Sequence, residues 1–150
     1  MYTGILHLHN LLRYVIIILL VWAIVKSFIG WFGKKKYTPT DDKISLFLLI
    51  SIHLQALLGL ILYFISPIVE SALSNFGASM KDPILRFWGI EHIASMIIGV
   101  TIITMGRARA KNSKTDTAKF KKQAIYFVLA MVLIFSAIPW PWSAISRAWF

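Results

Sequence analysis

The chain has 150 residues, of which 58% are hydrophobic and only 15% are charged. A soluble domain is typically about 45–50% apolar and about 25% charged, and one of this size could not bury so much apolar surface. The composition therefore indicates a membrane protein and excludes ordinary soluble enzyme folds. The chain has no cysteine, which excludes disulfides, thiolate metal sites and haem attached through a CxxCH motif.

Four apolar segments are long enough to cross the hydrocarbon layer, which takes about 20 helical residues. They are residues 4–32, 44–66, 84–106 and 123–142. Pro67 ends the second segment, and Asp82 followed by Pro83 begins the third with an N-cap and a proline in the first turn. Because the loops are short and no linker is visible, we expect one all-α domain over residues 1–150, a membrane-embedded antiparallel four-helix bundle.

Basic residues gather in alternate loops of this predicted bundle. Five lysines surround the first connection and seven basic residues surround the third, whereas only Lys81 and Arg86 lie near the second. Lys and Arg are retained on the cytoplasmic side, where anionic lipid attracts them. We therefore expect an N-out, C-out, multi-pass protein of the bacterial inner membrane. The position of the basic residues in these loops explains the excess positive charge. The lipid bilayer is therefore the expected partner, and nucleic acid is not.

Ionisable side chains at membrane depth are costly, so each one indicates a function. The polar candidates within the spans include all four histidines of the chain: His7, His9, Arg13, His53, Gln55, Glu91 and His92. At 1.5 Å of rise per residue, His9 lies about 9 Å, His92 about 12 Å and His53 about 16 Å below the outer surface. Three helices therefore place an imidazole at similar heights in the outer half of the bundle.

Two facing imidazoles at one height form the axial pair that a b-type haem needs, and we expect one haem b per chain. Small residues such as Gly59 would let the macrocycle approach the backbone. Arg13, one turn from His9, and Arg86 are candidate partners of the haem propionates. Two other interpretations stay open: Arg13 could form a buried ion pair with Glu91, and Arg86 could be an interfacial anchor.

Three short motifs resemble small four-helix cytochrome b-like membrane proteins of bacteria. They are the pair His7 and His9, the stretch His53–Tyr63, and the stretch Trp88–Lys111. The resemblance implies haem b and electron transfer, with His53 and His92 as leading axial ligands and His9 close behind. The estimated depths slightly favour His9 with His92, and the choice stays open. A single haem in the outer half would need a quinone or an outer-side redox protein to complete the electron path.

Two other classes of function are compatible with the same residues. The first is a zinc, iron or copper site, with nitrogen and carboxylate ligands suited to such ions, made by His9, His53, His92 and Glu91. The second is a cofactor-free accessory subunit of a larger complex, or a homo-oligomer, in which neighbouring side chains satisfy the histidines. No nucleophile–base pair or phosphate-binding glycine loop is visible, so whether the chain is an enzyme stays open.

Overall fold

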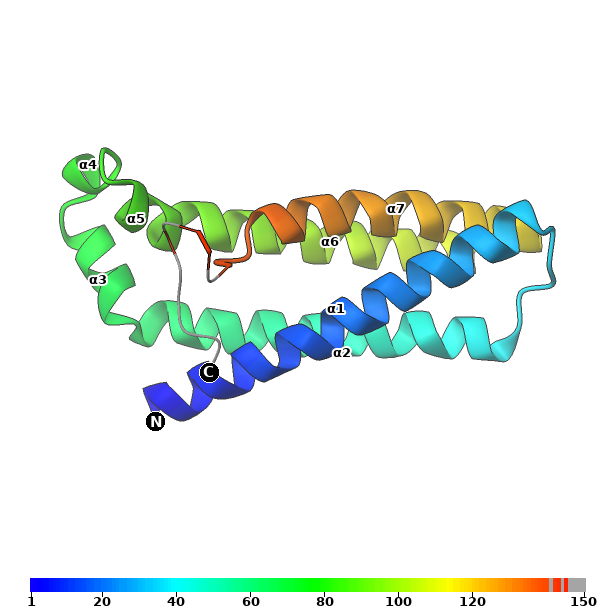
Figure 1. Cartoon of the computed structure of the whole chain (residues 1–150), viewed down its shortest axis with the longest axis horizontal. Helices are drawn as coiled ribbons and strands as arrows, with labels where there is room; N and C mark the ends of the chain where they lie inside the picture. The colour runs from blue at the N-terminus through cyan, green and yellow to red at the C-terminus, as the bar shows by residue number, and fades with distance from the viewer. Residues whose placement is uncertain (141, 144, 146–150) are drawn as a thin grey trace.

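The computed structural model describes residues 1–140, 142, 143 and 145, and in this part of the chain every regular element is helical. Figure 1 shows the long helices running lengthwise through the molecule, with the short helices gathered at one end. The long helices are α1 (Tyr2–Phe32), α2 (Pro39–Ile65), α6 (His92–Lys111) and α7 (Asp116–Ser136). The short ones are α3 (Pro67–Ser74), α4 (Phe76–Ser79), α5 (Pro83–Arg86) and the π-helix η1 (Phe87–Glu91). The predicted all-α class is confirmed for these residues.

Three helical stretches among the described residues are long and apolar enough to cross a membrane: Tyr2–Phe32, Pro39–Ile65 and Pro83–Lys111. They match the first three predicted spans, and the predicted start of the third is confirmed, because the Asp82 carboxylate accepts hydrogen bonds from the amides of Ile84 and Leu85 at 2.8 and 3.0 Å. These stretches are the expected features of a multi-pass membrane protein.

The predicted fourth span, residues 123–142, is wrong in extent, because α7 begins at Asp116 and ends at Ser136. Its first two turns carry four charged residues, Asp116, Lys119, Lys121 and Lys122. Pro139 disfavours helical geometry at the residue before it, and the helix ends shortly before that point. The apolar part of α7 is therefore shorter than the hydrocarbon layer is thick.

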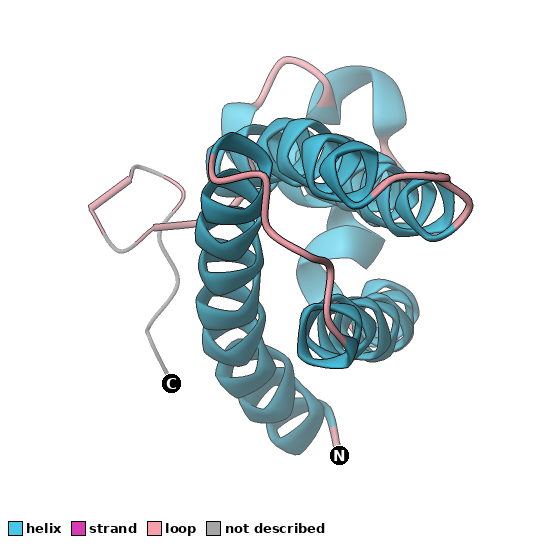
Figure 2. Ribbon diagram, turned by 90° about the vertical axis from the view of Figure 1, so that its right-hand side faces the viewer, coloured by secondary structure: helices cyan, strands magenta, loops and turns pink. Residues whose placement is uncertain are grey.

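Each long helix packs along two others: α1 contacts α2 and α7, and α6 contacts α2 and α7. Leu20, Leu48, Ile103 and Phe127, one from each long helix, are fully buried where these helices meet. Gly106 permits the close approach of α6 and α7, since a Cβ atom there would lie 2.5 Å from the Cβ of Tyr126. Figures 1 and 2 both show α1 inclined to the other long helices, which separates its N-terminal half from α7.

The outward faces of the long helices are covered by large apolar side chains. Phe64 is 82% exposed and Ile18 is 65% exposed, and similar residues follow one another along every long helix. A soluble monomer rarely exposes contiguous apolar surface on this scale. Hydrocarbon is the solvent that suits these faces.

A capping box begins α2 at the end of the molecule opposite the short helices. The Thr38 backbone amide donates to the Asp41 carboxylate at 2.9 Å, and the Asp41 amide donates to the Thr38 hydroxyl at 3.4 Å. Nearby, the Gln123 side-chain amide donates to the Tyr37 hydroxyl at 2.8 Å. These bonds hold the α1–α2 loop against α7, so the two basic loops lie at the same end of the molecule (Figure 1).

Candidate functional site

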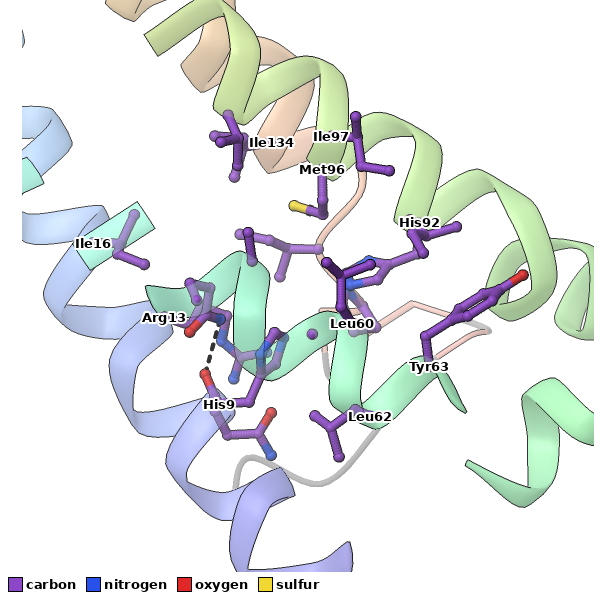
Figure 3. Close-up of a pocket in the computed structure, with 18 of the residues that line it drawn as sticks. His9, Arg13, Ile16, Leu60, Leu62, Tyr63, His92, Met96, Ile97 and Ile134 are labelled. Carbon is purple, nitrogen blue, oxygen red and sulfur yellow. Dashed lines mark hydrogen bonds between the residues drawn. The ribbon is translucent and has the colours of Figure 1, made fainter. Parts of the chain in front are cut away.

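A cavity of about 160 Å³ lies between α1, α2, the η1–α6 stretch and the end of α7. Half of its lining residues are Leu, Ile or Val, and Figure 3 shows side chains from several helices converging on it. Five of its lining residues have strongly polar side chains: His9, Asn10, Arg13, Gln55 and His92. An apolar cleft with a few convergent polar groups is the usual form of a ligand site in a helical bundle.

The imidazole of His92 is oriented by a backbone carbonyl. Its Nδ1 lies 2.8 Å from the carbonyl oxygen of Ala137, just beyond the end of α7. A carbonyl only accepts, so in the neutral ring Nδ1 carries the hydrogen and Nε2 carries the lone pair. Histidines that bind metal ions commonly donate their other N–H to a carbonyl in this way, because the bond fixes the tautomer and the ring plane.

The π-helix η1 immediately precedes His92 and forms part of the same wall. Tyr63, which also lines the cavity, donates its hydroxyl hydrogen bond to the carbonyl oxygen of Gly89 at 2.8 Å. Arg86 and Glu91, five residues apart, pair across the wide turn with 2.6 Å between Nε and Oε1. Single π turns are frequent at functional sites, because the extra residue redirects the side chains that follow. Tyr63 and η1 therefore set the direction from which His92 meets the cavity.

His9 meets the cavity from α1, against a glycine of α2. A Cβ atom at Gly59 would lie 3.2 Å from His9 Cε1, so only glycine leaves the ring its present place without crowding. Gln55 donates its side-chain amide hydrogen bond to the backbone carbonyl of His9 at 2.9 Å, which ties the same turn of α1 to α2. Figure 3 shows His9 and His92 reaching the cavity from different helices.

Arg13 brings a positive charge to the same cavity. Its Nη2 donates to the Tyr14 hydroxyl at 3.1 Å, whereas its buried Nε has no hydrogen-bond partner among the described residues. No carboxylate of the described residues lies within 4.0 Å of Arg13. The Oε1 atom of Gln55 is likewise buried without a partner in this part of the chain. The cavity therefore offers a cation and an acceptor to a polar ligand group.

The structure shows the partners of Glu91 and Arg86, which bear on two of the interactions predicted for the arginines. Glu91 pairs with Arg86, so the hypothesised buried pair of Arg13 with Glu91 does not form. Arg86 also donates to the carbonyl of Met80 at 3.2 Å and does not line the cavity. Its guanidinium is thus engaged within the short-helix end of the molecule, away from where the predicted propionate contact would be made.

His53 lies outside the cavity. Its side chain is exposed on the outer face of α2, with Nδ1 2.8 Å from the carbonyl oxygen of Leu49, and it does not line the space that His9 and His92 share. His7 is exposed as well. The described residues contain no group of three or more His, Asp or Glu side chains that could hold a metal ion. The structure therefore does not bring together the four ligands of the predicted metal site, His9, His53, His92 and Glu91.

No protein-family model, curated protein or solved structure matches this chain. A function is therefore inferred from the cavity itself. Among the described residues it presents two imidazoles from different helices, one guanidinium with no carboxylate within 4.0 Å, and a largely apolar wall. Tyr63, Gly89 and η1 were not singled out as part of a site from the sequence, although the spacing of Arg86 and Glu91 matches the period of a π turn.

Proposed function

We propose that this chain is a membrane-embedded haem b protein that transfers electrons, with one haem held in the cavity by His92 and His9. The observation that carries the proposal is the hydrogen bond from His92 Nδ1 to Ala137, which gives Nε2 the protonation state that an iron ligand needs. His9 is the other imidazole that lines the cavity, and His53 does not line it.

The chemistry of the rest of the lining supports the same proposal. A porphyrin is a flat apolar ring with two carboxylate arms, and the wall offers apolar side chains and one arginine that has no carboxylate within 4.0 Å among the described residues. Arg13 would bind a propionate through parallel hydrogen bonds from its guanidinium. Such a pair would also neutralise a charge that is expensive within a membrane.

When bound, haem supplies reversible one-electron oxidation and reduction. The residues of this chain supply the ligand field, the orientation and the exclusion of water. The Ala137 carbonyl holds the plane of His92, Gly59 and Gln55 hold the turn that carries His9, and the apolar wall lowers the local dielectric constant. In haem proteins these are the features that set the reduction potential.

The proposal includes a membrane arrangement. We infer that α1, α2, α6 and the shorter α7 form an antiparallel four-helix bundle in a bacterial inner membrane, with both basic loops in the cytoplasm. The N-terminus, the α3–α5 segment and the haem would then lie toward the outer side. A quinone or an outer-side redox protein would exchange electrons with this site.

Difference spectra of purified variants test the proposal. The wild-type protein in detergent is expected to show a b-type reduced-minus-oxidised spectrum with one haem per chain. His92→Ala and His9→Ala are expected to lose it, whereas His53→Ala, the matched control, keeps it. Loss of the spectrum in His53→Ala with retention in His9→Ala would contradict the proposed ligand pair. A featureless wild-type spectrum after expression with a haem supply would contradict haem binding itself.

A further inference from the structure

Positive charge is concentrated at the end of the molecule where the α1–α2 and α6–α7 loops lie, at the right in Figure 1. This basic end consists of twelve basic residues: Lys26, Lys34, Lys35, Lys36, Lys43, Arg107, Arg109, Lys111, Lys114, Lys119, Lys121 and Lys122. They account for most of the 16 Lys and Arg residues of the chain, whose net charge is +10. Only three acidic residues, Asp41, Asp42 and Asp116, lie at the same end.

All three of these carboxylates already have cationic partners. Asp41 pairs with Lys26 at 3.1 Å, Asp42 with Arg107 at 3.1 Å, and Asp116 with Lys119 at 3.8 Å. Among the described residues, the other nine cations of the basic end have no carboxylate within 4.0 Å. Eight of the nine are lysines. No carboxylate in the described part of the chain offsets their mutual repulsion, so the basic end favours an anionic surface.

Two lysines at the start of α7 contact aromatic rings at the end of α1 and in the α1–α2 loop. Lys121 of α7 places its Nζ 5.5 Å from the centre of the Trp31 ring, at the end of α1. Lys119 similarly lies 5.3 Å from the ring of Tyr37. The chain turns sharply at Lys34, where φ is 48°, so that three consecutive lysines follow directly after α1. The Lys34 amide donates to the Trp31 carbonyl at 3.4 Å, so this lysine run begins beside the residue whose ring Lys121 contacts.

An aromatic stack marks the depth of this patch. The rings of Phe28, Trp31 and Phe32 are nearly parallel, with centroids 4.9 to 6.2 Å apart, and Phe32 is 72% exposed. Exposed tryptophan and other aromatic rings at the end of a spanning helix lie at the level of the lipid headgroups. In a membrane whose headgroups lie at the level of this stack, the lysines that follow it would be at the height of the phosphates.

We propose that the basic end binds the headgroups of anionic phospholipids, with Lys34, Lys35, Lys36 and Lys121 as the principal contacts. The predominance of lysine favours a lipid surface over nucleic acid. The lysine ammonium is a hydrated point charge, whereas nucleic-acid recognition favours the planar guanidinium of arginine, which makes paired hydrogen bonds. Each lysine near an anionic membrane surface strengthens binding about fivefold. This site is separate from the cavity and does not depend on haem.

Lipid titration of the purified full-length chain tests the proposal. The protein in neutral detergent receives phosphatidylglycerol or phosphatidylcholine with the same acyl chains, and the thermal unfolding temperature and the retained lipid, by native mass spectrometry, are measured. Phosphatidylglycerol is expected to bind and to stabilise the protein, and phosphatidylcholine is not. The triple variant K34Q/K35Q/K36Q is expected to bind phosphatidylglycerol about a hundredfold more weakly.

Lys81→Gln is the matched control, because Lys81 is an exposed lysine outside the basic end. It is expected to bind as the wild type does. Equal binding of the two lipids, or equal losses in Lys81→Gln and the triple variant, would overturn the proposal. Stabilisation by inorganic phosphate, or by an oligonucleotide but not by phosphatidylglycerol, would assign the patch to a soluble anion or to nucleic acid and would also overturn it. If the triple variant does not fold, the affinity of the wild-type protein for phosphatidylglycerol is measured at increasing salt concentration. The proposal requires this affinity to fall as ionic strength rises, and an unchanged affinity would overturn it.

Discussion

Replacing Gly59 with alanine would perturb His9 while changing little else. The new Cβ atom would lie 3.2 Å from His9 Cε1, closer than the separation of about 3.5–4.0 Å at which carbon atoms attract one another. Cε1 lies between the two ring nitrogens, so relief of this contact turns the directions in which both nitrogens point. Alanine also favours a helix over glycine by about 0.8–1.0 kcal/mol, which offsets part of the crowding.

We therefore expect Gly59→Ala to keep the thermal stability of the haem-free protein within a few degrees of wild type while weakening haem binding. Changes beside a metal ligand typically cost about ten- to a hundredfold in affinity, and a loss of that size is expected here. Haem titration followed by absorbance gives the affinity. Gly4→Ala is the matched control, because Gly4 is also in a helix and a Cβ atom there would have no neighbour within 4 Å. Equal haem affinity in both variants would refute the assignment of His9.

Other predictions concern the supports of the site and the loop. Tyr63→Phe removes the hydrogen bond to Gly89 and should cost about 1–3 kcal/mol of stability, or several degrees in the unfolding temperature, and shift the haem spectrum. Arg13→Gln should lower haem affinity and respond less to esterification of the propionates than wild type. Burial raises the pKa of Tyr37 above its ordinary value, so the contribution of Tyr37 to stability should be fully present below about pH 10 and be lost as pH rises through the raised pKa. Tyr37→Phe should remove that part of the alkaline loss in a pH series of unfolding temperatures.

Helix termini were predicted well where a proline or a capping side chain marks them. The N-cap at Asp82 depends on the side chain and the two amides that follow it, so it could be read directly from the Asp–Pro pair. Pro67 similarly marks the end of α2 at Ile65, whereas the predicted starts 44 and 123 lie several residues after the observed starts, Pro39 and Asp116. The apolar run that begins at residue 124 continues past Ser136, so the predicted end of the fourth span, residue 142, lies beyond the end of α7. That end depends on Pro139 and on the bond from the Trp140 indole to the Phe135 carbonyl.

The direction in which a side chain points around its helix could not be predicted from the sequence. His53 and His92 were placed at similar heights, but only His92 lines the cavity. Two residues advance an α-helix by about 200°, so Gln55 faces the cavity while His53 faces away from it. The η1 turn adds a further rotation before His92, and nothing in residue composition fixes such a turn. Only the packing of α2 against α1 and α6 decides which polar side chain is inside.

The electron paramagnetic resonance spectrum of the oxidised wild-type protein tests the central claim most directly. Two imidazole ligands make ferric haem low-spin, so the account predicts a low-spin signal that integrates to one haem per chain. Substitution of His9 or His92 should convert this signal to high-spin or abolish it, and substitution of His53 should leave it unchanged. A high-spin wild-type signal, or a low-spin signal that survives the loss of His92, would contradict the account.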